Sequence, residues 1–433
     1  MTESEPEPVP AAGATTAADA PIAPRKKSDD RPTLGPEFLR QLWTANTVTV
    51  TVLAILVALV IGGIMIVVST PTVTAKFGYF FARPQDALSA SWYTVRDAYL
   101  QLFYGSVFDF SSIGQPGVTW WQWFQPISET LSYATPLVFT GLSVAVAFRG
   151  GLFNIGGQGQ AIMGLTVAAT LGFVLHLPIV IHLIVALLGG LIGGAIWGFI
   201  PGFLKARTGA HEVITTIMLN YIAQLFLNWF ILQGGVHNPN RLDAISKDVL
   251  GSAKLPRLLN ENLRVDGGII LALLFTALVA WLLNRSTTGF ELRAVGSNPD
   301  AARTAGMSVP RTIIITMVIA GALAGLGGST VVLGAQANSL TGPVAGNIGF
   351  NGLLVALLGR VRPWGVVLGA LLFGALQAGG NRMQSYAGIS LELVSVLQSL
   401  IVLLVAAPAL VKAIFRLREA RAARLGTVMA KGW

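Results

Sequence analysis

Five polar residues follow one another at intervals of four along an apolar stretch of the sequence, residues 213–232. They are Glu212, Thr216, Asn220, Gln224 and Asn228. Because an α-helix turns about once every 3.6 residues, this spacing predicts a polar stripe that winds slowly around one helix. Polar groups at membrane depth must pair with one another or face water. The stripe therefore predicts either hydrogen bonds that hold helices together, or a path whose hydroxyls and amides replace part of the hydration of a polar solute.

Two glycine-rich segments carry a second set of candidate residues. Residues 149–160 contain five glycines. Glycine frees the backbone from the helix, which is tolerated at membrane depth only inside protein or beside a wet cavity. The pattern Asn-Ile-Gly-x-(Gln/Asn)-Gly begins at Asn154 and again at Asn347, and its second copy adds an amide at Asn351. We predict a broken membrane helix at each copy, with these three amides beside a translocation path.

The two copies are expected to enter the membrane from opposite sides, the first from the cytoplasmic side. That arrangement is typical of an inverted repeat, and paired broken helices indicate the pathway of a transporter. A chance match is the alternative, because the shared phrase is short.

The composition requires a membrane environment. Hydrophobic residues make up 53% of the 433 residues and charged residues only 11%, against about a quarter in average soluble domains. The sequence therefore predicts an all-α polytopic membrane protein in contact with lipid. Its net charge of +9 comes mostly from Arg and Lys at the ends of apolar runs, where they set topology, so nucleic acid is not an expected partner. There is no cysteine, which excludes disulfides and thiolate metal sites.

About ten transmembrane passes are predicted from the apolar runs. These runs are 48–68, 131–148, 160–177, 179–204, 213–232, 267–283, 312–333, 348–358, 364–378 and 391–410. The run 348–358 is well below the roughly 20 residues that a pass needs. We expect irregular chain from about Gln336 to continue it, or a re-entrant segment. Ladders of small residues predict closely packed helices, with Gly190, Gly194 and Gly198 in one span and Gly321 and Gly325 in another.

The remaining regions divide the chain further. Residues 1–40 are rich in Pro, Ala, Glu, Ser and Thr and predict a disordered cytoplasmic tail, and residues 413–433 predict a basic one. The transmembrane domain is 41–412. Within it, 69–129 is expected to be an extracytoplasmic connection. Its apolar residues, spaced three and four apart, predict a helix at the membrane interface or, alternatively, a soluble-facing packing helix; they are Leu88, Trp92, Val95, Tyr99 and Leu102.

Positive charge in the short loops sets the orientation. Most of these Arg and Lys residues fall on one side, which places both termini in the cytoplasm. The loop 233–266 departs from this rule, since it carries five Arg or Lys on the outside. It also carries acidic residues, and long loops obey the rule less reliably.

The cytoplasmic loop 285–311 contains a short helix signal. Asn298 can cap a helix that begins at Pro299 and carries Asp300 in its first turn, with Gly306 near its end. Arg303 is then expected on the exposed surface. The helix is either a connector between two spans or a docking element for a partner.

The sequence carries no signature of catalysis. It has no G-x-x-x-x-G-K-[ST] phosphate loop, no His, Asp or Glu cluster with metal spacing, and no G-x-S-x-G nucleophile motif. We therefore expect a chain that is not an enzyme, with no cofactor and no metal of its own.

Four segments in order resemble the inner-membrane permeases of bacterial ABC importers, and more closely the branch that takes up simple sugars and nucleosides. They are 148–160, 212–222, 296–306 and 349–360, and the resemblance extends over about 87–410. The motif Phe153-Asn154-Ile155-Gly156-Gly157 resembles the corresponding segment of nucleoside permeases more than that of permeases for ribose or branched-chain amino acids. Two departures are Gln158, where relatives often have an acidic residue, and His211, where they often have Asn.

This resemblance implies a permease with several partners in the bacterial cytoplasmic membrane. Those partners are a second permease, either a copy or, as the family suggests, a paralogue, two cytoplasmic ATPase subunits that bind ATP and Mg²⁺, and an extracytoplasmic binding protein. The solute would be a nucleoside or a related simple sugar. The resemblance also implies that the segment from Asn298 to Gly306 is the coupling helix, seated in a groove of the ATPase.

An ion-coupled secondary transporter of a small polar solute is the alternative, since such proteins also use inverted repeats and broken helices. Coupling usually needs acids or bases within the membrane, and this chain offers only Glu392 and Glu212 at a helix end. A membrane anchor without transport activity is a third class, against which the polar stripe argues. Neighbouring genes for a phosphate-loop ATPase and a lipoprotein would separate the first class from the other two.

Overall fold

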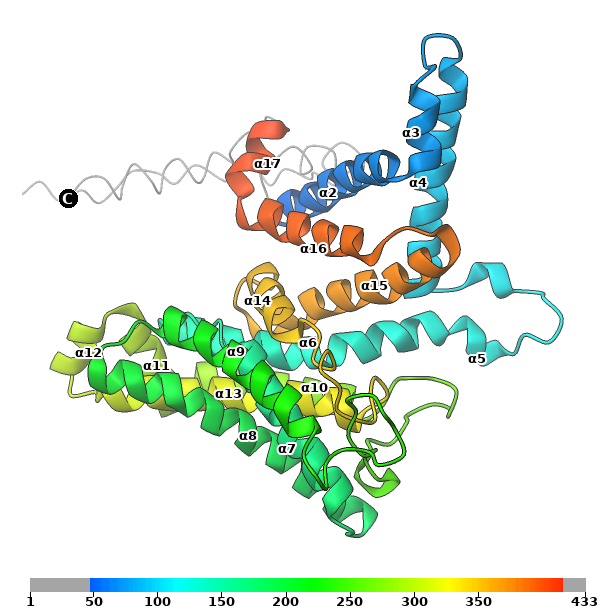
Figure 1. The fold of residues 1–433 in the computed structure, drawn as a ribbon. Helices are drawn as coiled ribbons and strands as arrows, with labels where there is room; N and C mark the ends of the chain where they lie inside the picture. Colours follow the sequence, from blue (N-terminus) through cyan, green and yellow to red (C-terminus); the bar gives the residue numbers. More distant parts are fainter. Residues whose placement is uncertain (1–46, 416–433) are drawn as a thin grey trace, which may run out of the picture. The chain divides into compact units, whose positions relative to one another are not determined.

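Helices form nearly all the regular structure in the computed structural model, which describes residues 47–415 (Figure 1). The helices are α2 Thr47–Ser69, α3 Pro71–Phe77, α4 Pro84–Ser106, α5 Trp120–Trp123, α6 Gln125–Arg149, α7 Gly157–Val174, α8 Ile179–Thr208, α9 Glu212–Ile231, α10 Gly268–Arg285, α11 Thr287–Ser297, α12 Pro299–Thr304, α13 Val309–Leu333, α14 Ile348–Leu358, α15 Pro363–Ala387, α16 Leu391–Ala406 and α17 Pro408–Ile414. Two short 3₁₀ turns, Phe110–Ser112 and Gly251–Ala253, complete them. Between residues 47 and 415 the only β-pairings are isolated bridges. The predicted tail 1–40 and most of the predicted tail 413–433 lie outside the described residues.

The prediction of an all-α polytopic membrane protein is confirmed. Among the described residues, seven helices are long and apolar enough to cross a membrane: α2, α6, α8, α9, α10, α13 and α15. The other three predicted passes correspond to α7, α14 and α16, with 18, 11 and 16 residues. α14 and α16 are shorter than the roughly 20 residues of a full pass, whereas α7 is as long as α10 but is not among the seven. The total of ten passes therefore stays a prediction.

One predicted run is divided in the structure. The apolar run 391–410 was expected to be continuous, but α16 ends at Ala406 and α17 begins at Pro408. Proline lacks the amide hydrogen of a helix interior and disfavours helical geometry at the residue before it. Ala407 accordingly lies outside both helices, with φ −111° and ψ 66°.

The connection 69–129 contains the predicted helix, which is α4. It packs against α2, α6 and α15, and it runs across the direction of α6 and α15 (Figure 1). Its placement at the membrane interface stays a prediction, as does the extracytoplasmic position of the whole connection.

Small residues bring α8 and α13 into backbone contact, as the glycine ladders predicted. A Cβ atom on Gly198 would lie 3.0 Å from the Cα atom of Gly321, and one on Gly194 would lie 2.6 Å from the Cα atom of Gly325. Neither distance leaves room for a larger residue, so these helices meet without intervening side chains. The most buried of the candidate spans is α6, which packs against α13, α14 and α15.

Candidate translocation site

The first glycine-rich segment breaks the chain between α6 and α7. The Asn154 side chain there is 1% exposed. Its Nδ2 donates to Gln160 Oε1 at 2.9 Å, and Gln160 Nε2 donates back to Asn154 Oδ1 at 3.2 Å. Asn154 thus fixes the shape of the break from within the protein.

Asn220, in the first half of α9, pairs with this same break. Asn220 Nδ2 donates to the Ile155 carbonyl at 3.0 Å, and the Gly159 amide donates to Asn220 Oδ1 at 2.8 Å. Thr216 is fully buried, and its hydroxyl donates to the Val213 carbonyl at 3.1 Å. Asn220 therefore satisfies a donor and an acceptor that the missing helix leaves open.

Gln224 and Asn228, in the second half of α9, belong to a different set of hydrogen bonds. Gln224 Nε2 donates to the Gly342 carbonyl at 2.8 Å and to Asn228 Oδ1 at 3.2 Å. Asn228 itself is exposed. The structure thus places Thr216, Asn220, Gln224 and Asn228 in hydrogen bonds within the chain. Their role as a solute path stays a prediction.

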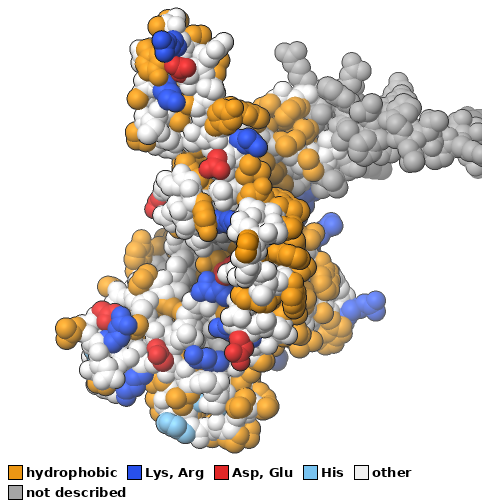
Figure 2. Space-filling model, turned by 90° about the vertical axis from the view of Figure 1, so that its right-hand side faces the viewer, with side chains coloured by type: hydrophobic (Ala, Val, Ile, Leu, Met, Phe, Trp, Pro, Cys, Tyr) orange, Lys and Arg blue, Asp and Glu red, His pale blue; other side chains and the backbone are white. Residues whose placement is uncertain are grey.

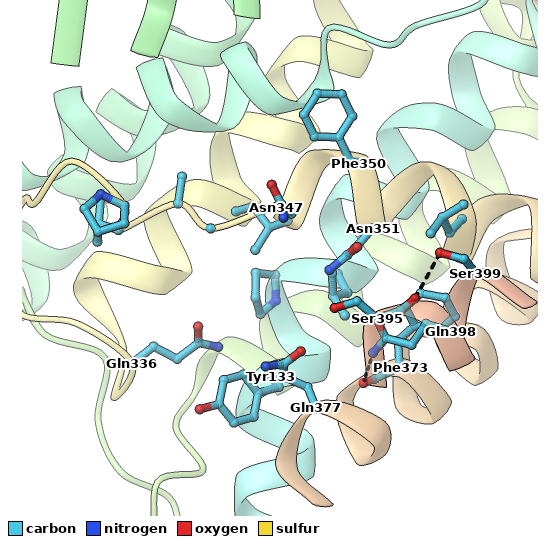
Figure 3. Close-up of a pocket in the computed structure, with 18 residues that line it drawn as sticks. Tyr133, Gln336, Asn347, Phe350, Asn351, Phe373, Gln377, Ser395, Gln398 and Ser399 are labelled. Atoms are coloured by element: carbon cyan, nitrogen blue, oxygen red, sulfur yellow. Dashed lines mark hydrogen bonds between the residues drawn. The ribbon is translucent and has the colours of Figure 1, made fainter. Parts of the chain in front are cut away.

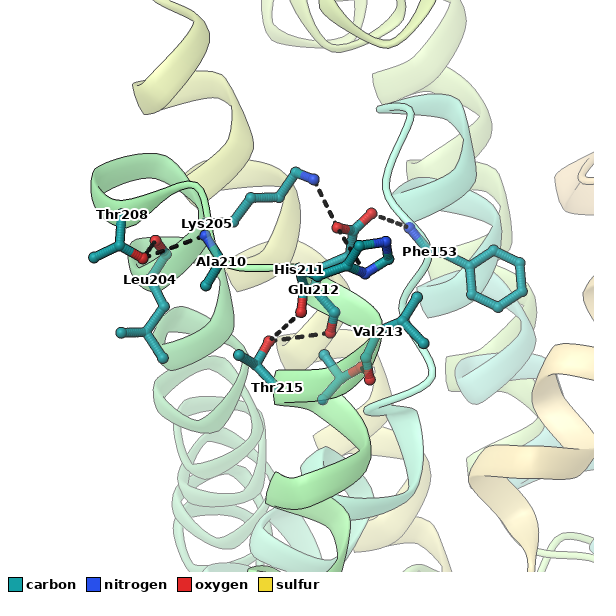
Figure 4. A network of polar contacts seen from close by, with 10 residues as sticks. Phe153, Leu204, Lys205, Thr208, Ala210, His211, Glu212, Val213 and Thr215 are labelled. Atoms are coloured by element: carbon teal, nitrogen blue, oxygen red, sulfur yellow. Dashed lines mark hydrogen bonds and ion pairs between the residues drawn. The ribbon is translucent and has the colours of Figure 1, made fainter.

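Glu212, at the start of the stripe, holds a polar network between three segments (Figure 4). Lys205 Nζ, from the end of α8, lies 2.6 Å from Glu212 Oε2. The Phe153 amide of the glycine break donates to Glu212 Oε1 at 3.5 Å. His211 Nδ1, one of the two departures noted in the sequence, lies 3.9 Å from the same carboxylate. Glu212 is therefore engaged as an ion-pair partner beside the break.

The second copy of the pattern also follows irregular chain, as predicted. Residues 334–347 form no helix, and α14 begins at Ile348. Gln158 joins the two copies: its Nε2 donates to the Gly346 carbonyl at 2.7 Å, and its Oε1 accepts from the Gly349 amide at 2.8 Å. The first turns of α7 and α14 are thus in direct contact.

The far ends of the two helices meet different segments of the chain. The far end of α7 meets the segment whose Leu250 amide donates to the Gly172 carbonyl at 3.0 Å. Beyond α14, the Val361 carbonyl accepts from Arg149 Nε at 3.3 Å, where α6 ends. The inverted repeat, with the two breaks entering the membrane from opposite sides, stays a prediction.

A cavity of about 640 Å³ lies beside the second break. α6, the segment before α14, α14 itself, α15 and α16 form its walls (Figure 3). None of the described residues that line it is charged. Its polar lining consists of Tyr133, Gln336, Asn347, Asn351, Gln377, Ser395, Gln398 and Ser399, and Phe350 and Phe373 contribute aromatic rings. We refer to it as the neutral cavity.

Three amides of the neutral cavity are available to a solute. Within the described chain, the side chains of Asn347, Asn351 and Gln377 form no hydrogen bond. By contrast, Gln336 Nε2 donates to the Ser132 carbonyl at 2.6 Å. Gln398 Nε2 likewise donates to the Phe373 carbonyl, at 3.4 Å. The neutral cavity therefore offers donors and acceptors without a net charge.

The structure brings two of the seven predicted path residues to the neutral cavity, Asn347 and Asn351. The other five, Asn154, Thr216, Asn220, Gln224 and Asn228, lie outside it. Three polar residues of α16, Ser395, Gln398 and Ser399, line the cavity, whereas Glu392 at the start of that helix does not. Sequence reasoning missed Tyr133, Gln336 and Gln377. A signal existed for Gln377, because Asn381 and Ser385 follow it at intervals of four, but the predicted apolar run ends at Ala378.

The loop 285–311 contains the predicted short helix, α12. Asn298 Oδ1 accepts from the amides of Asp300 and Ala301 at 3.1 and 3.0 Å, as a helix cap does. Ala302 is buried, whereas Asp300 and Arg303 are exposed and lie 3.3 Å apart. Pro299 opens the helix, and Gly306 has the positive φ of 84° that favours glycine after its end. The helix and its cap are confirmed, and its coupling role stays a prediction.

Residues 127–406 match the protein family described as "Branched-chain amino acid transport system / permease component". The chain belongs to this permease family. The guanosine ABC transporter permease protein NupP of Bacillus subtilis (strain 168) is 38% identical to the permease over 280 residues, which is 65% of this chain and 80% of NupP. The nucleoside ABC transporter permease protein NupB of Lactococcus lactis subsp. cremoris (strain MG1363) is 37% identical over 289 residues, 65% of this chain and 79% of NupB.

A further relative is named for a sugar. The glucose ABC transporter permease protein TsgB13 of Haloferax volcanii is 29% identical over 289 residues, 64% of this chain and 75% of TsgB13. The permease is thus a multi-pass membrane component of ABC transport, a family that works with ATPase and binding-protein partners. The helices α2 to α5 precede the matched region.

Proposed function

We propose that the permease forms the translocation path of an ATP-driven importer for a nucleoside or a related simple sugar. The observation that carries this proposal is the neutral cavity, where Asn347, Asn351 and Gln377 present amides that have no partner within the described chain. The similar relatives named for guanosine, nucleosides and glucose support the same solute class.

The chemistry of the neutral cavity suits such solutes. Amides can both donate to and accept from sugar hydroxyls and base edges. The rings of Phe350 and Phe373 give flat apolar surfaces against which a base can pack. An uncharged lining would leave a phosphate without a counter-charge, so nucleosides fit better than nucleotides.

Partner subunits supply the energy in this proposal. The sequence has no phosphate loop, so ATP and Mg²⁺ would bind to two cytoplasmic ATPase subunits that dock on α12. A paralogous second permease and an extracytoplasmic binding protein complete the assembly. Both termini would be cytoplasmic, in the cytoplasmic membrane of a bacterium.

The two acids that the sequence offers for ion coupling, Glu212 and Glu392, do not line the neutral cavity. Glu212 is engaged with Lys205 at 2.6 Å. Glu392 is exposed at the start of α16 and does not line the neutral cavity. A coupling carboxyl would be expected beside the solute.

Uptake by the reconstituted complex tests the proposal. Proteoliposomes containing both permeases and the ATPase subunits, with binding protein outside, should accumulate labelled nucleoside or sugar only with ATP inside. Replacing Asn351 or Gln377 by Leu should reduce uptake about fivefold per lost hydrogen bond of about 1 kcal/mol, with assembly unchanged. Gln384→Leu, an exposed amide on the same helix as Gln377 but outside the neutral cavity, is the matched control. No uptake by the wild-type complex, or equal uptake by all three variants, would overturn the proposal.

A further inference from the structure

A second cavity shares one wall with the neutral cavity. Its volume is about 350 Å³, and Tyr133 is the one described residue that lines both. The other residues around it are Gly105, Asp109, Gln122, Gln125, Pro126, Glu129, Arg264, Ala378, Asn381, Arg382, Ser385 and Tyr386. We refer to it as the charged chamber. Tyr133 therefore stands between a charged space and an uncharged one.

The charges of this chamber are paired across its walls. Arg382 Nη1 lies 2.7 Å from Asp109 Oδ2, and Arg264 Nη1 lies 3.2 Å from Glu129 Oε2. The Arg382 guanidinium also lies 5.0 Å from the ring centre of Tyr386. These contacts tie the segment after α4 to α15, and the loop before α10 to the start of α6. The chamber walls are thus held by ion pairs on four separate segments.

Tyr133 and Asn381 form an uncharged hydrogen bond at the boundary between the two cavities, beside the Arg264 guanidinium. Asn381 Nδ2 donates to the Tyr133 hydroxyl at 2.9 Å, joining α15 to α6. On α15, Gln377 lines the neutral cavity, and Asn381, one turn further along, lines the charged chamber. A neutral hydrogen bond contributes little net free energy, because the same groups bond readily to water or to another partner. A solute hydroxyl can therefore replace either member of the pair.

We propose that Tyr133 and Asn381 form a threshold through which the solute passes between the charged chamber and the neutral cavity. The solute would contact the Tyr133 ring and take over the hydrogen bond of its hydroxyl. This inference rests on the proposed function for the identity of the solute, a neutral molecule with hydroxyls and a flat ring. The separation of the two cavities by this pair rests on geometry alone.

Thiol labelling tests the threshold without measuring transport. The natural chain has no cysteine, so Ser395→Cys places a single thiol in the neutral cavity of the full complex. A membrane-impermeant methanethiosulfonate reagent is applied from each face of the membrane separately. Ser385→Cys, in a separate preparation, identifies the face to which the charged chamber opens.

Removing the Tyr133–Asn381 hydrogen bond should speed labelling of the cavity thiol. Tyr133→Phe and Asn381→Ala should each raise the rate at Ser395→Cys about fivefold from the chamber face, the factor for a bond of about 1 kcal/mol. Tyr386→Phe, which alters a tyrosine of the chamber alone, should leave the rate unchanged. Tyr133→Phe keeps the ring and its volume, so the fold is retained, and assembly with the partner permease verifies this.

The outcomes separate this inference from the proposed function. Unchanged labelling in both Tyr133→Phe and Asn381→Ala would overturn the threshold, whatever the complex transports. An equal rise in Tyr386→Phe would also overturn it, since the effect would then belong to the whole chamber. Faster labelling in the two threshold variants supports the threshold, whether or not the wild-type complex takes up nucleoside or sugar. Absence of uptake by the wild-type complex would overturn only the proposed function.

Discussion

Gly151 and Gly296 meet backbone to backbone, although they belong to two segments far apart in the sequence. A Cβ atom on Gly151 would lie 2.8 Å from the Cα atom of Gly296, and one on Gly296 would lie 2.5 Å from the Arg149 carbonyl oxygen. Gly151 also has a φ of 69°, which favours glycine. The helix α11, in the loop that carries α12, thus rests directly on the break between α6 and α7.

The first prediction concerns this contact. Gly296→Ala should push α11 away from the break, and such overpacking typically destabilises by about 1–3 kcal/mol. The apparent Tm of the purified complex should fall. Gly234→Ala is the matched control, because no heavy atom lies within 4 Å of the Cβ position there. A Gly296→Ala permease as stable as the control would show that α11 can move without cost.

The second prediction concerns Gln158, whose amide both donates and accepts. Gln158→Glu keeps the acceptor for the buried Gly349 amide but, when ionised, loses the donor to the Gly346 carbonyl. Gln158→Leu loses both, and an unsatisfied buried group costs about 1–3 kcal/mol. We expect the stability order wild type, then Glu, then Leu, measured by apparent Tm. A Leu variant that is more stable than the Glu variant would contradict it.

Local signals made α12 predictable, whereas long-range pairing could not be read from the sequence. The cap at Asn298 and the start at Pro299 act within a few residues, and the structure has both. Asn220 was recognised as a polar group that needs a partner, but its partners Ile155 and Gly159 lie more than 60 residues away. The sequence left both hydrogen bonding within the bundle and path lining open for such a residue.

The neutral cavity was only partly predictable for the same reason. Asn347 and Asn351 belong to the repeated pattern Asn-Ile-Gly-x-(Gln/Asn)-Gly, which made them candidate path residues. Gln336 lies in irregular chain and belongs to no periodic pattern. Gln377 begins a polar series with Asn381 and Ser385 that lies mostly beyond the predicted apolar run 364–378. The meeting of the cavity amides depends on how α6, α14, α15 and α16 pack, which is a property of the tertiary structure.

The third prediction concerns the ion pair of Lys205 and Glu212. Glu212 is only 8% exposed, so Lys205→Met should leave its carboxylate poorly compensated and lower stability by about 1–3 kcal/mol. Adding Glu212→Gln removes the charge, and the double variant should lose less than the sum of the two single changes. Apparent Tm values of the four proteins complete the cycle. Strict additivity would mean that the pair contributes nothing to stability.

The fourth prediction is a pH dependence at Asp109. Burial opposes its ionisation, but hydrogen bonds from Arg382 and Ser111 outweigh burial and hold the pKa of Asp109 below its usual range. A lowered pKa in the folded state stabilises above the unfolded pKa of about 3.9, and this stability is lost as the pH falls through the folded value. The Tm difference between wild type and Asp109→Asn should therefore be largest near neutral pH and shrink below about pH 4. An equal difference at pH 7 and pH 3 would contradict the assignment.

The fifth prediction separates the two interpretations of α12. Arg303 is exposed, and its contact with Asp300 is a surface ion pair, worth about 0–1 kcal/mol. Arg303→Glu should therefore leave the fold and the Asn298 cap intact while reversing the charge that α12 presents to a partner. If α12 docks the ATPase, ATP hydrolysis stimulated by loaded binding protein should fall and less ATPase should co-purify.

Arg241→Glu is the matched control for that change. Arg241 forms an exposed ion pair with Asp243 at 2.8 Å, in the loop between α9 and α10. Each variant reverses the charge of an exposed arginine and removes an ion pair with a neighbouring aspartate. A difference between the two variants therefore comes from the location of the reversed charge, on α12 or in the loop between α9 and α10. Normal hydrolysis, uptake and ATPase retention in Arg303→Glu would identify α12 as a connector. A selective loss in Arg303→Glu, with Arg241→Glu unaffected, would place the contact with the ATPase at this helix.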